Sequence, residues 1–289
     1  MSIQYNSQYV DEKYLPILEP NLYTDTVIIP GVTYTDKYVT GPAGQLFVHK
    51  LTKGNVIEPG APGRDFENAA AADSLIAIQL NNNFQKSTKI YGVQANAVAF
   101  NMGESYMQMS IETVRESRQY SALACLVKEG TADVDTTAIT TGANAVAKLI
   151  ALRKAIKNNH GKANYALVST EIYALLLGEL GLREVYDPAI RTAEMMNRFG
   201  LRIMECNSFD VNSAKYIDYT GTTQAVKLSN VELIVGYSEA FSIVPNLEAM
   251  RMKESEHFIG TLAQVEMNMG FRVTSPDQVI VKYKSTISA

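Results

Sequence analysis

Cysteine and histidine are scarce in this chain of 289 residues, which limits the metal and redox chemistry that it can support. Its two cysteines, Cys125 and Cys206, are too far apart for a CxxC motif, and we expect both to be small buried side chains. The three histidines, His49, His160 and His257, form no HExxH or HxH spacing. The sequence therefore predicts no metal site.

The motifs of nucleotide binding and serine hydrolysis are also absent. No GxxxxGK[ST], GxGxxG or GxSxG occurs. His257 follows Glu254 and Glu256, but alternating charge on a strand-rich stretch is typical of a solvated face. We therefore expect no catalytic residues, no cofactor and no enzyme activity, while a triad assembled from distant residues is not tested by spacing alone.

The chain has neither a strong charge bias nor a long apolar run. Its net charge is -4 and its pI is near 5.5, whereas a dedicated nucleic-acid reader carries a basic stripe. No apolar run reaches the roughly 18 to 20 residues of a membrane span, and the first thirty residues lack a signal-peptide core. With 46% apolar residues, we expect a soluble globular protein of one or two domains, made in the cytoplasm and without a membrane partner.

The N-terminal segment has little hydrophobic face of its own. Residues 1–25 interleave tyrosines, among them Tyr5 and Tyr9, with polar residues and two helix-stopping prolines. The tyrosines favour an arm that becomes ordered on a neighbouring subunit, with a frayed terminus as the alternative.

The next segment, residues 26–83, combines short apolar runs with a glycine- and proline-rich stretch. Five glycines and three prolines lie between Gly41 and Gly63, a density that prevents a long helix and breaks strands into short pieces. So long an extended stretch is unusual in a compact domain without a function. It predicts a protruding loop that is buried against another subunit, with an ordinary surface hairpin as the alternative.

A long helix is predicted from about Asn96 to Glu129, after a strand over residues 84–93. The helix segment contains no proline, and Gly130 follows it as a terminating C′ residue. Its apolar stripe is thin and its surface is rich in charge, so we expect a strut packed along one side.

The remainder alternates helix and strand before it becomes strand-rich. We expect an exposed turn over residues 131–144, and then elements that follow the order of a small α/β domain. The expected helices are 143–158, 170–180 and 188–198, and the expected strands are 165–168, 199–204, 231–235, 241–244, 260–265, 271–273 and 279–283.

This succession of segments resembles a tailed-bacteriophage major capsid protein, whose fold is shared with encapsulin shells. The stretches that carry the resemblance are YALVSTEIYALLL, NRFGLRIMECNSF, GYSEAFSIVPNLEAMRMKE and GTLAQVEMNMGFRVTSPDQVIVKYK. The resemblance covers nearly the whole chain and rests on segment order and weak motifs.

The resemblance implies an α+β fold, the phage major capsid fold, with five parts. These are an N-terminal arm (1–25), an extended β loop with flanking strands (26–83), a peripheral domain with a long spine helix (84–142), an axial α/β domain (143–230) and returning strands that are mainly peripheral (231–289). The chain begins almost directly at the arm, so we expect scaffolding to come from a separate or cleaved protein, and we expect no covalent crosslinks.

The implied function is a structural subunit that self-assembles into an icosahedral or prolate shell around the double-stranded DNA of a tailed phage. The implied partners are copies of the chain as hexamers and pentamers, scaffolding, portal and decoration proteins, and DNA bound without sequence specificity. The implied location is the virion, assembled in the host bacterial cytoplasm. The alternatives are an encapsulin-like nanocompartment shell and, from another class, a small α/β enzyme or ligand-binding protein with an unrecognised pocket.

A shell subunit holds its neighbours through many modest contacts. We expect burial of apolar loop positions to supply most of the adhesion, and rim ion pairs to add about 0 to 1 kcal/mol each. The predicted inter-subunit contacts are Tyr5, Tyr9, Leu51, Lys53, Val56, Ile57, Glu58, Arg64, Asp65 and Phe66.

Overall fold

The computed structural model describes residues 31–33, 45–51, 73–92, 102–183 and 199–285. Three α-helices lie in these ranges: α3 (Met102–Glu129), α4 (Gly142–Asn158) and α5 (Thr170–Arg183). None of the helices in the described ranges is long and apolar enough to cross a membrane.

The strands form two larger sheets and two separate hairpins. Their bounds are β1 Val32–Thr33, β2 Gln45–Leu51, β3 Asp73–Gln79, β4 Asn82–Tyr91, β5 Thr131–Ala132, β6 Tyr165–Val168, β7 Arg202–Glu205, β8 Ala214–Ile217, β9 Thr223–Val226, β10 Val231–Gly236, β11 Phe241–Glu254, β12 Gly260–Val273 and β13 Val279–Tyr283. Short 3-10 helices span Asn207–Asp210, Leu228–Asn230, Ser238–Ala240 and Pro276–Gln278.

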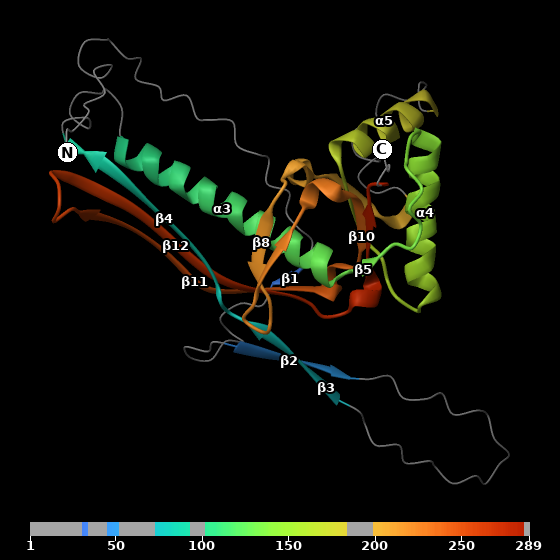
Figure 1. Ribbon diagram of the computed structural model, residues 1–289, viewed down its shortest axis with the longest axis horizontal. Helices are drawn as coiled ribbons and strands as arrows, with labels where there is room; N and C mark the ends of the chain where they lie inside the picture. The colour runs from blue at the N-terminus through green and yellow to red at the C-terminus, as the bar shows by residue number, and fades with distance from the viewer. Residues whose placement is uncertain (1–30, 34–44, 52–72, 93–101, 184–198, 286–289) are drawn as a thin grey trace, which may run out of the picture.

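The first sheet, in the order β1-β11-β12-β4, is long and narrow, and α3 runs along one of its faces (Figure 1). The alternation of β12 explains this packing. Ala263, Val265, Met267 and Met269 are buried, and the residues between them are half-buried. One face of β12 thus supplies the apolar surface on which the helix lies.

The sequence divided this region into shorter strands than the fold contains. We predicted strands at 241–244, 260–265 and 271–273, whereas β11 and β12 are single 14-residue strands paired along their length. Pro245, which cannot donate to the ladder, stays opposite Met269, and the register shifts directly after it, between Pro245 and Leu247. The prediction of interrupted strands was wrong.

The second sheet, in the order β5-β13-β10-β6-β7, is covered on both faces. Along β6, Tyr165 and Leu167 pack into the core shared with α3, whereas Ala166 and Val168 pack against α4 and α5. All four are buried, as are all six residues of β10. This burial on both sides explains why β6 is a continuous apolar run and why β10 departs from one only at Glu232, without the alternation of a half-exposed strand.

The long helix is confirmed from Met102 to Glu129, but it is more than a strut packed on one side. Its first half is half-exposed, whereas residues 121–127 are all buried because this end is inserted between the two sheets. Gly130 follows the helix as predicted, without the positive φ of a left-handed C′ residue. A Cβ at Gly130 would lie 2.6 Å from the Leu126 carbonyl oxygen, so close packing is the reason for a glycine here.

The remaining element predictions have mixed outcomes. The structure confirms the helix at 143–158, the strand at 165–168 and the helix that begins at Thr170. It adds β5 in the predicted turn, and the β8–β9 hairpin, for which the sequence made no prediction. The predicted helix 188–198 and the apolar run 27–29 lie outside the described residues.

Candidate interaction surfaces

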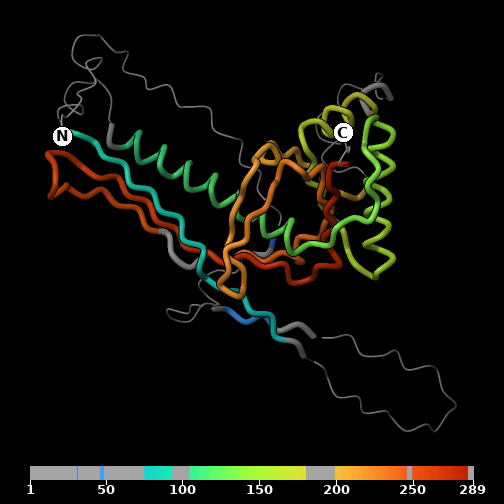
Figure 2. Tube along the Cα trace, viewed as in Figure 1, coloured from blue at the N-terminus to red at the C-terminus, as the bar shows by residue number. Residues whose placement is uncertain are grey.

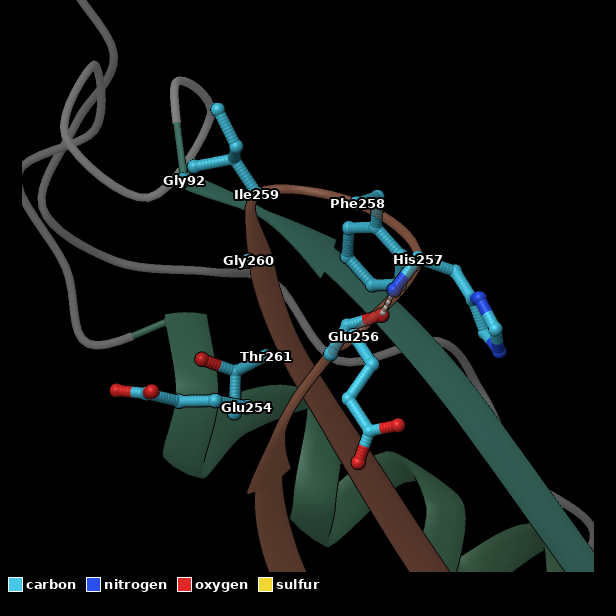
Figure 3. A pocket seen from close by; sticks show the side chains of 9 residues that line it. Gly92, Glu254, Glu256, His257, Phe258, Ile259, Gly260 and Thr261 are labelled. Atoms are coloured by element: carbon cyan, nitrogen blue, oxygen red, sulfur yellow. Dashed lines mark hydrogen bonds between the residues drawn. The ribbon is translucent and has the colours of Figure 1, made fainter.

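The tip of the β11–β12 hairpin carries the only charged cluster that the sequence singled out. A depression of about 630 Å³ lies there, lined by Glu254, Glu256 and His257 among others. The three side chains are exposed, and the ring of His257 points away from the Glu254 carboxylate (Figure 3). The tip is thus a solvated turn, as predicted, and Ile259 beside it is 90% exposed.

The other histidines do not form a site with His257. His160 is exposed at the end of α4, and His49 lies in β2, opposite Leu75. Among the described residues, no three His, Cys, Asp or Glu side chains are grouped as metal ligands would be. Cys125 and Cys206 are both free and buried, as predicted, and burial raises the pKa of each thiol, which disfavours the reactive thiolate.

A partly buried ion pair joins the end of α3 to β12. Arg272 donates to Glu129 Oε1 at 2.8 Å, and the Val273 N–H donates to Glu129 Oε2 at 2.9 Å. Burial raises the pKa of the Glu129 carboxyl, against the opposing effect of these donors. The Arg272 guanidinium also stacks 3.8 Å from the ring centre of Tyr219. Each charged group in this network has a structural partner, so we assign the network to holding β12 and the β8–β9 hairpin on the helix.

The β2–β3 hairpin projects from the long sheet (Figure 1), and the strand pairing places apolar residues on both of its faces. On one face, Leu46 and Val48 pack against a small core made by Ile78, Leu80 and Val244. On the other face, Phe47 is 54% exposed and Leu75 is 60% exposed. A strand pair exposed to water on one side normally carries polar residues there, so this face is suited to a partner.

A second uncovered apolar surface is a groove of about 460 Å³ between the first half of α3 and β11. Met107 and Ile111 of the helix and Met252 of the strand line it, and Met252 is 51% exposed. Glu104, Gln108, Glu112 and Arg115 line the rest of the groove. Among the described residues, no strand pairs with the outer edge of β11 beyond Ile243. Unpaired edge strands of this kind bind other chains readily.

Of the ten predicted contact residues, only Leu51 lies in a described element, as the last residue of β2, opposite Asp73. The other nine, Tyr5, Tyr9, Lys53, Val56, Ile57, Glu58, Arg64, Asp65 and Phe66, lie outside the described residues. The sequence reasoning missed Phe47, Leu75, Met250, Met252 and Ile259, which the fold leaves exposed. The continuous run Leu46-Phe47-Val48 was the available signal, because a strand points successive residues to opposite faces.

Comparisons with known proteins find this architecture among solved structures, although not by sequence. No protein-family model matches the chain, and no curated protein matches its sequence. Solved structures do match: a chain of the capsid structure of the cyanophage P-SCSP1u has a TM-score of 0.74 and 13% identity, over 94% of this chain and 92% of that chain. A chain of Mycobacterium phage Che8 has a TM-score of 0.71 and 15% identity, over 97% and 98%.

A chain of the capsid of Myoviridae phage XM1 also matches, with a TM-score of 0.64 and 12% identity, over 98% of this chain and 99% of that chain. The matches are nearly end to end, so they cover both sheets and the long helix together. The chain has the tailed-phage capsid fold.

Proposed function

We propose that this chain, built on the tailed-phage capsid fold, is the structural subunit of a tailed-phage capsid, icosahedral or prolate, that encloses double-stranded DNA. The observation that carries the proposal is the end-to-end fold match to capsid chains. In this reading the protein acts through assembly and not through catalysis, and its location is the virion, after assembly in the host bacterial cytoplasm.

The two uncovered apolar surfaces support a head-to-tail contact between copies. The β2–β3 hairpin projects from one end of the long sheet, whereas the groove lies along the half of α3 that is far from it (Figure 1). A copy therefore meets its neighbour's groove and not its own. Contacts between two different surfaces form rings when the rotation closes, which is how hexamers and pentamers arise.

We extend the contact to the loop beyond the hairpin and to the N-terminal arm. Leu51, Val56, Ile57 and Phe66 would add burial, Lys53, Glu58, Arg64 and Asp65 would add rim ion pairs, and Tyr5 and Tyr9 would anchor the arm. Deletion of residues 52–65 is expected to abolish assembly and leave the subunit folded. Intact shells from the deletion variant would remove the loop from the contact.

We assign residues 84–142 and most of 231–289 to a peripheral domain, and 143–230 to an axial domain. The elongated sheet with α3, and the compact sheet with α4 and α5, support two such bodies. The compact sheet also draws β10 and β13 from the last segment. The further partners in this proposal are separate scaffolding, portal and decoration proteins, and packaged DNA held without sequence specificity, which suits a net charge of -4.

Negative-stain electron microscopy with light scattering tests the function. The purified chain is measured alone and then together with its neighbouring gene products. Closed shells or tubes are the expected result, and nuclease-protected double-stranded DNA inside shells from infected cells separates a phage capsid from a protein nanocompartment. A chain that stays monomeric under every condition would contradict a shell role.

A further inference from the structure

The side chain of Asn82 ties the corner between β3 and β4 to a distant part of the chain. Only Leu80 and Asn81 separate the two strands, and Asn82 begins β4 with 3% of its surface exposed. The Asn82 amide nitrogen donates to the Ile217 carbonyl at 3.2 Å, and the Ile217 N–H donates to Asn82 Oδ1 at 2.8 Å. The amide thus forms the pair of hydrogen bonds that a peptide group makes in an antiparallel ladder.

Ile217 is the last residue of β8, so this contact ties the corner to the β8–β9 hairpin. Figure 2 shows the turn of that hairpin beside the corner. The hairpin is itself fixed to α3, because the Ser121 hydroxyl donates to the Lys215 carbonyl at 2.7 Å and Tyr216 is buried in the main core. A continuous path therefore runs from the long helix through β8 to Asn82.

The β2–β3 hairpin has little else to fix its direction. It pairs with no third strand among the described residues, and a two-stranded hairpin is marginally stable alone. Its inner face rests on the small core of Ile78, Leu80 and Val244. It also passes close to Gly270 of β12, where a Cβ would lie 2.6 Å from the Gln79 carbonyl oxygen. Apolar contact and close approach resist separation, but they are less directional than two hydrogen bonds.

We propose that Asn82 is a positioning residue that couples the β2–β3 hairpin to the β8–β9 hairpin and so sets the angle at which the hairpin projects. The coupling of the two hairpins is independent of the proposed function, and only its effect on shells rests on that function. If the hairpin is the contact with the next copy, its angle fixes the relation between copies, and release of Asn82 widens the range of shell curvature.

Hydrogen exchange on the unassembled protein tests the coupling directly. In Asn82→Ala, the population of the released corner rises by a factor of about 5 to 150, the effect of losing two hydrogen bonds. We expect exchange to become faster by one common factor in peptides from β3 and from the β8–β9 hairpin, and to stay unchanged in β10. Asn83→Ala is the matched control, because Asn83 is exposed and donates only to Glu266 Oε1, at 3.2 Å.

The isosteric variant Asn82→Asp keeps an acceptor for the Ile217 N–H but places a buried carboxylate oxygen opposite the Ile217 carbonyl, so its exchange should rise at least as much as that of Asn82→Ala. If the alanine variant does not fold, the aspartate variant alone decides. Faster exchange in β8–β9 without any change in β3, or equal acceleration in β10, would overturn the coupling.

Shell size is the second readout. Asn82→Ala should give shells of mixed diameter under conditions where the wild-type chain and Asn83→Ala give uniform shells. Uniform shells from Asn82→Ala would refute the positioning role in assembly. If the wild-type chain forms no shell at all, the proposed function fails, and the exchange experiment still decides whether Asn82 couples the two hairpins.

Discussion

Replacement of Phe47 and Leu75 by serine should prevent assembly without unfolding the subunit. Both side chains lie on the outer face of the β2–β3 hairpin and are 54% and 60% exposed. Full burial of a phenylalanine or leucine contributes about 1.5 to 3 kcal/mol, so covering the exposed parts of both contributes roughly 2 to 3 kcal/mol to each contact. The parts of the two side chains that are already buried contribute, by the same measure, roughly 1 to 3 kcal/mol to folding, so the variant should be destabilised by that amount and remain folded.

The assay is the critical concentration of shell formation, measured by light scattering, with particles counted by electron microscopy. A loss of roughly 2 to 3 kcal/mol at each contact raises that concentration by roughly 30- to 150-fold. Thermal unfolding of the unassembled subunit checks that the variant is folded. Val134→Ser is the matched control, because Val134 is 96% exposed in a loop far from the hairpin in sequence. An unchanged critical concentration for the double variant, with the control also unchanged, would refute the assignment of this face to the contact.

Three further predictions concern stability. The Tyr165 hydroxyl is buried without a hydrogen-bond partner, so Tyr165→Phe should leave stability unchanged or raise it by about 1 kcal/mol in urea unfolding, and a clear loss would contradict this reasoning. Burial raises the pKa of Glu129, so the folded state binds more protons than the unfolded state, and the contribution of Glu129 to stability falls as pH rises from the ordinary glutamate pKa through the raised one. Glu129→Gln should therefore flatten this part of the curve of melting temperature against pH. An unchanged slope in the variant would contradict this role of Glu129. Gly270→Ala places a Cβ 2.6 Å from the Gln79 carbonyl oxygen and should lower the stability of the folded subunit by about 1 to 3 kcal/mol. Gly178→Ala is the control, because open space surrounds Gly178, and it should be neutral or stabilising. Equal urea unfolding midpoints for the two variants would show that the corner has room to adjust.

Part of the fold could be predicted from the sequence because local patterns identified it. The spacing of Leu149, Leu152 and Ile156 predicted α4, and all three are buried on the face that packs on the second sheet. The long proline-free stretch that ends at Gly130 predicted α3, and its C-terminal boundary is correct. These elements depend on interactions within a few residues, which a single sequence contains.

The joining of β11 and β12 into one long hairpin could not be predicted in the same way. The predicted strand ended at residue 244, yet Met250 is paired opposite Val265 and the strand continues to Glu254. The partner strand, and not the local composition, decides where such a strand ends. The same holds for the corner, because the pairing of Asn82 with Ile217 joins residues that are 135 positions apart.

The sequence by itself determined where the long helix ends, the absence of the usual catalytic and metal-binding motifs, and the burial of both cysteines, because these follow from composition and local spacing. Only the tertiary structure decided which apolar residues remain uncovered. Phe47 and Leu46 are neighbours in the same strand, yet Leu46 packs on the small core and Phe47 faces outward. A strand with apolar residues on both faces does not specify which face its own chain will cover, and that choice is made by the packing of β3 against β12.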